Sequence, residues 1–125
     1  MDDEGSDERR ARARLTHRGG RYLPRLPWLA DGQPHDAFTL IRQALWRANT
    51  DRGALELPED LLAAIALLAS ARAELDQLEA GLLFVARAEG LTWAQVARSL
   101  GLRTAQAAQQ RHERVLARLD GEEGS

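Results

Sequence analysis

One apolar stripe at helical spacing runs through the middle of this 125-residue chain and constrains its fold more than any other feature. Pro58, Glu59 and Asp60 precede the stripe, and these residue types suit the first turn of a helix. Such a stripe predicts a single helix of about 30 residues, roughly 45 Å long, that ends near Gly90. A break near Ser70 is the alternative. The apolar positions are Leu61, Ile65, Leu68, Ala71, Leu75, Leu78, Leu82 and Val85.

Composition also favours helices. Ala and Leu dominate the 44% of hydrophobic residues, β-branched residues are scarce, and the aromatics are two Phe, one Tyr and three Trp. This mixture suits helices better than strands, and a chain of this length has room for one modest core. We therefore predict an all-α protein, a short helical bundle built on the long central helix.

The N-terminal sequence and the absence of cysteine bear on the compartment. The chain begins MDDEGSDERR, which is acidic where a secretory signal is basic and then apolar. Nowhere does an apolar run approach the roughly 20 residues that span a bilayer. The chain has no Cys, which excludes disulfides and thiolate metal sites. We expect a cytoplasmic protein without membrane contact.

Charge is distributed unevenly along the chain, although the formal net charge is only -2. Residues 9–25 carry seven Arg and no acid, and residues 91–118 carry five Arg and one Glu. Residues 31–89 between them hold ten acids and five Arg. Local fields, rather than the total charge, then decide which partner the chain attracts.

The first basic block falls in a segment without any apolar stripe. Residues 1–20 combine charge runs with glycine, a composition that predicts a disordered acidic and basic arm. Two interpretations stay open: an arm that follows a nucleic-acid backbone, and a solubilising tail. The basic side chains of the arm are Arg9, Arg10, Arg12, Arg14, Arg18 and Arg21.

Residues 21–73 are expected to form a helical dimerisation or interaction region. Three Pro in residues 21–35 predict an extended segment that lays its aromatics on a helical core, and a short amphipathic helix follows from Asp36. The long helix would project beyond what this region covers, so we expect a second copy to cover the rest. The predicted dimer residues are Phe38, Ile41, Leu45, Leu61, Ile65 and Leu68.

The clearest local signal is LTWAQVARSLGLRTAQAAQQRHERVLARL, residues 91–119. Thr92 with Gln95 forms a capping box at the start of a short helix. Gly101 suits the left-handed conformation that ends helices, and Thr104 can cap the next one. Small side chains around this turn let two helices cross at a steep angle. These features predict a helix-turn-helix.

The long central helix would thus lead into a C-terminal helix-turn-helix unit over residues 74–119, with a disordered tail at residues 120–125. Successive residues of the last helix lie about 100° apart, which places a polar face opposite its apolar side. Glu113 is the single acid there, whereas a merely solvated face in an acid-rich protein would carry more.

The chemistry of that polar face matches the major groove of double-stranded DNA. Gln can pair with adenine and Arg with guanine, while Ala can approach a thymine methyl group. Arg side chains on the flanks lie where phosphates would be. The candidate DNA-binding residues are Arg98, Arg103, Thr104, Gln106, Ala107, Gln110, Arg111, Arg114 and Arg118.

A family resemblance covers about residues 74–119. The stretch LDQLEAGLLFVARAEGLTWAQVARSLGLRTAQAAQQRHERVLARL resembles small actinobacterial regulators of the small-heat-shock-protein transcriptional regulator type and, more distantly, the DNA-binding region four of sigma factors. The resemblance implies a three-helix unit whose last helix reads DNA. Where that family's recognition helix begins Ser-Arg-Gln-Ala-Ala, this chain has Thr104-Ala105-Gln106-Ala107-Ala108. Ala105 lacks the family's Arg, and His112 stands where an aromatic is usual.

No catalytic, metal or cofactor site can be assembled from the sequence. His17, His35 and His112 are dispersed, and there is no Gly-rich phosphate loop or nucleophile motif. A lone His on an apolar face, such as His112, is usually a partly buried core residue. We therefore expect no enzyme, no cofactor and no metal.

The function that the sequence favours is a nucleoid-associated, sequence-specific transcriptional regulator. It would act as a homodimer that reads an inverted repeat through the helix-turn-helix. The alternative is a protein-interaction module that partners RNA polymerase, a sigma factor or another regulator.

Overall fold

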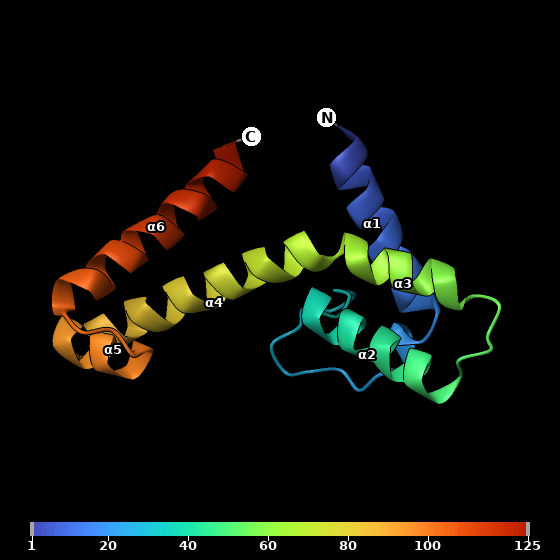
Figure 1. The fold of residues 1–125 in the computed structure, drawn as a ribbon, viewed down its shortest axis with the longest axis horizontal. Helices are drawn as coiled ribbons and strands as arrows, with labels where there is room; N and C mark the ends of the chain where they lie inside the picture. Colours follow the sequence, from blue (N-terminus) through green and yellow to red (C-terminus); the bar gives the residue numbers. More distant parts are fainter. Residues whose placement is uncertain (1, 125) are drawn as a thin grey trace. The chain divides into compact units, whose positions relative to one another are not determined.

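The computed structural model describes the backbone of residues 2–124 and the side chains of residue 5 and residues 7–121. Over this range the chain is all-helical and has no strand, which confirms the predicted fold class (Figure 1). The chain divides into two compact units, Met1–Arg72 and Ala73–Ser125. The elements are α1 (Asp2–His17), the 3-10 turn η1 (Gly20–Tyr22), α2 (Ala37–Thr50), α3 (Leu57–Ala66), α4 (Leu68–Ala88), α5 (Trp93–Leu100) and α6 (Ala105–Gly124).

Among residues 2–124, no helix combines the length and the hydrophobicity that a bilayer span requires.

The predicted single central helix is interrupted at Leu67. The Leu67 amide donates to the carbonyl of Ala64 at 3.1 Å, which makes a tighter turn than an α-helix, and α4 begins at the next residue. The prediction of one unbroken helix is therefore wrong. The alternative, a break near Ser70, is confirmed, and the break lies three residues before Ser70. Leu67 is fully buried. The packing of the N-terminal core therefore sets the backbone conformation at Leu67 and overrides the continuous helical pattern of the sequence.

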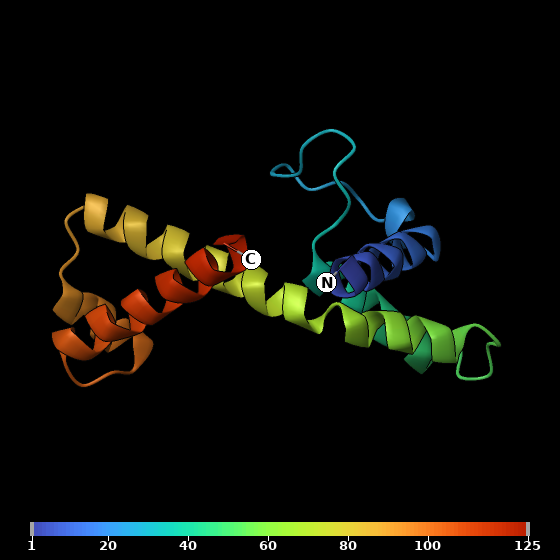
Figure 2. The same ribbon diagram turned by 90° about the horizontal axis from the view of Figure 1, so that it is seen from above.

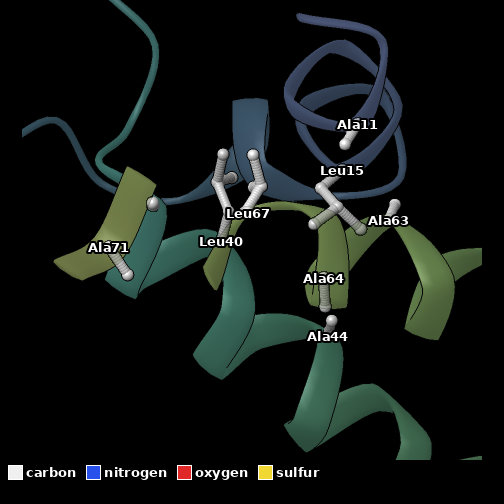
Figure 3. Close-up of a cluster of buried hydrophobic side chains, with 9 residues drawn as sticks. Ala11, Leu15, Leu40, Ala44, Ala63, Ala64, Leu67 and Ala71 are labelled. Atoms are coloured by element: carbon white, nitrogen blue, oxygen red, sulfur yellow. The ribbon is translucent and has the colours of Figure 1, made fainter. Parts of the chain in front are cut away.

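The core of the first unit is built largely from small side chains (Figure 3). Leu40 and Leu67 are its largest fully buried members. A Cβ placed on Gly20 would lie 2.6 Å from Leu40 Cδ2, so a side chain at this position would require the buried Leu40 to shift. The remaining members, Ala11, Leu15, Ala37, Ala44, Ala63, Ala64 and Ala71, let the helices pack at short distance.

The N-terminal segment belongs to this core. Residues 2–17 form α1, so the prediction of a disordered arm is wrong over this range, while Met1 lies outside the described residues. Ala11 and Leu15, one helical turn apart, are 6% and 3% exposed. Two apolar positions among so many charges are too few to register as a stripe, which is why the sequence pattern missed the helix.

The segment between η1 and α2 contains two turns, closed by hydrogen bonds from the Leu29 amide to the Leu26 carbonyl and from the Gln33 amide to the Ala30 carbonyl, so the predicted extended conformation is wrong there. In Figure 2 it loops away from the helices of the first unit. Tyr22, at the end of η1, and Trp28 are mostly exposed, so the prediction that they cover the core is wrong for these two aromatics. The helix expected from Asp36 is confirmed as α2, and the Asp36 side chain accepts a hydrogen bond from the Thr39 amide.

A buried carboxylate ties α1 to α3. Asp60, in the first turn of α3, is 4% exposed. Its Oδ1 accepts a hydrogen bond from Arg14 Nε at 2.9 Å, and its Oδ2 accepts one from Arg18 Nε at 3.1 Å. Since a buried charge is tolerated only when it is paired, two of the arm's arginines are needed to hold the fold.

We predict that Asp60→Ala lowers the free energy of unfolding by about 2 kcal/mol, because it removes the carboxylate that Arg18 contacts and leaves Arg14 with Glu56 alone. Glu59→Ala is the matched control, since Glu59 is the adjacent acid in the same helical turn and is exposed. Urea denaturation followed by circular dichroism measures both variants. Equal losses in the two variants would contradict this account of Asp60.

Candidate nucleic-acid interface

The second unit places two helices around a tight turn, with the caps that the sequence predicts. Thr92 Oγ1 accepts a hydrogen bond from the Gln95 amide at 3.1 Å, and Gln95 Oε1 accepts one from the Thr92 amide at 2.7 Å. Gly101 has φ 76°, the left-handed conformation expected at the end of α5. The Leu102 amide then donates to the Ala97 carbonyl at 2.8 Å and closes the turn. The predicted capping box and glycine turn are confirmed.

A small core joins α4, α5 and α6. Leu83 of α4, Val96 and Ala97 of α5 and Ala108 of α6 are all buried, and Trp93, Leu100 and Leu102 pack against them. Ala97 is 2% exposed and Ala108 is fully buried, so a larger side chain at either position would push α5 and α6 apart. Small residues at these two positions therefore fix the crossing of the two helices.

α6 begins where Thr104 caps it and continues further than predicted. Thr104 Oγ1 accepts a hydrogen bond from the Ala107 amide at 3.0 Å, as an N-cap does. The helix runs to Gly124, so the prediction of a disordered tail after Leu119 is wrong over residues 120–124, and Ser125 lies outside the described residues.

The exposed side of α6 carries most of the predicted base-reading residues. Ala108 and Val115 mark the buried side of the helix, and Ala107 is half-buried. Arg98, at the C-terminal end of α5, is also exposed. We call four exposed residues the α6 face: Arg103, which lies in the turn before the Thr104 cap, and Gln106, Gln110 and Arg114 of α6.

Arg111 and Arg118, predicted to contact phosphates, are engaged within the chain. Arg111 Nε donates to Glu79 Oε2 and its terminal nitrogen donates to Oε1, both at 2.9 Å. Arg118 makes the same two-pronged contact with Asp76, again at 2.9 Å for each bond. We call these two bidentate contacts the arginine forks. They tie α6 to α4, and they engage both arginines away from the α6 face.

The forks also change the acidity of their carboxyl groups. Hydrogen bonds from Arg111 lower the pKa of Glu79, and those from Arg118 lower the pKa of Asp76, because both favour the ionised carboxylate. At neutral pH both acids are ionised and matched by an arginine.

His112 is partly buried, as expected for a core residue, and contacts Trp93. The two ring centroids lie 5.5 Å apart at an interplanar angle of 45°. The Arg87 guanidinium lies 5.1 Å from the centroid of the Trp93 ring, a cation–π distance. Trp93 is therefore held between α4 and α6.

The predicted arm arginines all lie in the first unit. Arg12 donates to Glu8 and to the carbonyl of His35, while Arg14 and Arg18 hold Asp60. Arg10 pairs with Asp7, Arg21 lies over the Tyr22 ring, and Arg9 is exposed. Most of this basic block serves the fold of α1 and does not form a free arm.

The predicted dimer residues are divided between core and surface. Ile41 packs against the core of the first unit, and Leu61 is half-buried. The other four are exposed to different degrees: Phe38 (38%), Leu45 (53%), Ile65 (61%) and Leu68 (39%).

Comparison with known proteins adds no relative. No protein-family model matches the chain, and neither the curated proteins nor the solved structures show a significant match to it.

We predict that Arg111→Ala raises the pKa of Glu79 toward its ordinary value and lowers the free energy of unfolding by about 1 kcal/mol at neutral pH. The effect is modest because the Arg111 side chain is itself 39% exposed. A carboxyl pKa lowered by folding stabilises the fold above the ordinary pKa, and this stability is lost as the pH falls through the lowered value. The penalty should therefore shrink below about pH 4.

Carboxyl-carbon NMR titration of Glu79 and urea denaturation at several pH values measure these two effects. Arg114→Ala, which removes an exposed arginine of the same helix, is the control and should leave both unchanged. An unmoved Glu79 titration in Arg111→Ala would contradict the assignment.

Proposed function

We propose that this chain is a sequence-specific, double-stranded DNA-binding transcriptional regulator that reads the major groove with α6. The observation that carries the proposal is the α6 face, an exposed set of two Arg and two Gln directly after a capped helix and a glycine turn. A recognition helix needs this combination of a rigid backbone and side chains free to meet base edges.

Each residue of the face has a chemical role in this proposal. Gln106 and Gln110 suit the N7 and N6 groups of adenine, and Arg103 and Arg114 suit the O6 and N7 groups of guanine. Ala107 lies beside them and can meet a thymine methyl group. Arg98 and Thr104, at the edge of the turn, would contact phosphates in this proposal.

The local distribution of charge around the α6 face supports an anionic partner, although residues 73–125 together carry eight acids and six Arg. The forks leave Asp76 and Glu79 matched by Arg118 and Arg111. The positive electrostatic field over the α6 face then comes from the exposed Arg98, Arg103 and Arg114. Along the first half of α6 the only acid that opposes this field is Glu113. A cluster of unmatched arginines of this kind attracts the DNA backbone even though the chain as a whole is acidic.

We further propose that two copies bind together to an inverted repeat in the nucleoid, since two-fold operators mirror two-fold proteins. The resemblance of residues 74–119 to small actinobacterial regulators and to sigma factor region four points in the same direction. The second candidate is a module that binds RNA polymerase, a sigma factor or another regulator. Exposed large apolar side chains, such as Phe84 at 75%, favour it.

We predict that Gln106→Ala and Gln110→Ala each weaken binding to the preferred sequence by about 1–3 kcal/mol and relax base preference at particular positions, because each would remove a bidentate contact. Gln109→Ala is the matched control. It removes the same residue type from an exposed position on the same helix, at the edge of the α6 face, about 60° from Gln106 and about 100° from Gln110.

Selection from a random DNA library, followed by fluorescence anisotropy at several salt concentrations, measures these effects. Affinity should fall steeply with salt as phosphate contacts release counterions. Unaltered base preferences in both Gln variants would show that the α6 face does not read sequence. Absence of DNA binding, together with salt-insensitive binding to RNA polymerase, would favour the second candidate.

A further inference from the structure

The first unit contains an open pocket lined by several cationic side chains. Its volume is about 550 Å³, within the range of pockets that hold small molecules. Three segments of the chain contribute to the lining: α1, η1 and the loop that precedes α2. The residues that matter for its chemistry are Arg9, Arg12 and His17 of α1, Arg21 of η1, and Gly32 and Pro34 of the loop.

Hydrogen bonds within the loop give this wall of the pocket a defined shape. The Gln33 amide donates to the Ala30 carbonyl at 3.0 Å and closes a turn, in which Gly32 has φ 77°. Glycine adopts a positive φ without the strain that a side chain would cause. The Arg25 guanidinium donates to the carbonyls of both Ala30 and Gln33. The wall therefore has its shape before any ligand binds.

Arg12 attaches the loop to α1. Its Nη1 donates to the His35 carbonyl at 3.0 Å, and its Nε donates to Glu8 Oε1 at 2.9 Å. Glu8 also matches the charge of Arg12, whose side chain is 21% exposed. Pro34, the neighbour of His35, is thereby held at the pocket. Since the pocket is preformed, a ligand loses little binding energy to ordering it.

Three other cationic groups of the lining meet no carboxylate among the described side chains. Arg9 and His17, with Ala13 between them, follow at four-residue intervals along one side of α1, and both are exposed. Arg21 donates to the Tyr22 hydroxyl at 2.8 Å, which is a neutral partner.

Acids are absent from the described part of the lining. Asp31, the neighbour of Gly32, is exposed but does not line the pocket. The charges of Arg9 and Arg21 are therefore available to an anion, and His17 can add a third positive charge near neutral pH.

Charge and size together indicate the class of ligand. Two guanidinium groups and an imidazole match the charge of a phosphate monoester, about -1.5 to -2 at neutral pH. Arginine suits phosphate because its parallel N–H groups bind two oxygens at once. Ala13 and Pro34 add apolar surface, and a phosphate group alone does not fill the pocket. The ligand therefore carries an organic group as well.

We propose that this pocket binds a small organic phosphate monoester. Arg9, His17 and Arg21 hold the phosphate, and Ala13 and Pro34 contact the organic group. Arg12 is a positioning residue that keeps the loop on α1. The site lies in a different compact unit from the α6 face and does not rest on the proposed function. A chain with both sites would join a DNA-binding helix to a sensor of phosphorylated small molecules.

Amide chemical-shift mapping with phenyl phosphate tests the site. The full chain, labelled with 15N, is titrated with phenyl phosphate and, in parallel, with inorganic phosphate and with phenol. Phenyl phosphate should give saturable shifts at the amides of Ala13, His17, Arg21 and Gly32. It should bind more tightly than inorganic phosphate, which lacks the organic group, and more tightly than phenol, which lacks the charge.

The double variant Arg9→Gln with Arg21→Gln should weaken phenyl phosphate binding at least about tenfold, because it removes two hydrogen bonds to a charged group. Arg42→Gln with Arg52→Gln is the matched control. It changes the net charge equally, through two exposed arginines of the same unit that lie outside the pocket, and should leave the affinity nearly unchanged. Circular dichroism checks that both double variants stay helical.

Several outcomes would overturn the proposal. Without saturable shifts at millimolar phenyl phosphate there is no such site, and equal affinities for phenyl phosphate and inorganic phosphate would leave no role for an organic group. Equal losses in the two double variants would show attraction to net charge alone. If duplex DNA shifts the amides of Ala13 and His17 and phenyl phosphate does not, α1 contacts a nucleic-acid backbone instead. A chain that binds phenyl phosphate but no DNA overturns the proposed function alone.

Discussion

The two arginine forks between α6 and α4 determine what the second unit presents to its surroundings. Arg111 with Glu79 and Arg118 with Asp76 each make two bonds of 2.9 Å, a geometry that fixes orientation as well as distance. They hold α6 on α4 and draw the acids of α4 to one side. One consequence is the α6 face, whose arginines meet no carboxylate fork. The other concerns α4, whose exposed side between Leu75 and Val85 is apolar because Asp76 and Glu79 are bound by the forks.

In both basic blocks of the sequence, some arginines form ion pairs that stabilise the fold and others are exposed on the surface. In the first unit Arg14 and Arg18 hold the buried Asp60, and in the second unit Arg111 and Arg118 hold α4. The partners lie 32 to 46 residues away along the chain. A count of charges along the sequence does not reveal such pairs, because it treats every arginine as available to an outside partner.

Local signals predicted local structure well, and the failures concern long-range packing. Thr92 with Gln95, Gly101 and Thr104 were found from sequence because a cap depends on residues within one turn. The interruption at Leu67 and the folding of residues 2–17 into α1 depend on a core assembled from α1, α2, α3 and the first turn of α4. In the candidate site, the exposed Arg and Gln side chains could be predicted from helical spacing. The forks that engage Arg111 and Arg118 within the chain could not.

The central claim is that α6 contacts DNA through its exposed face, and amide chemical-shift mapping with a selected duplex tests it most directly. The full chain, labelled with 15N, is titrated with the duplex. The account predicts the largest shifts at Arg98 and from Arg103 to Arg114, with the amides of α1 little changed. Shifts confined to the first unit, or no shift at any duplex concentration, would contradict it.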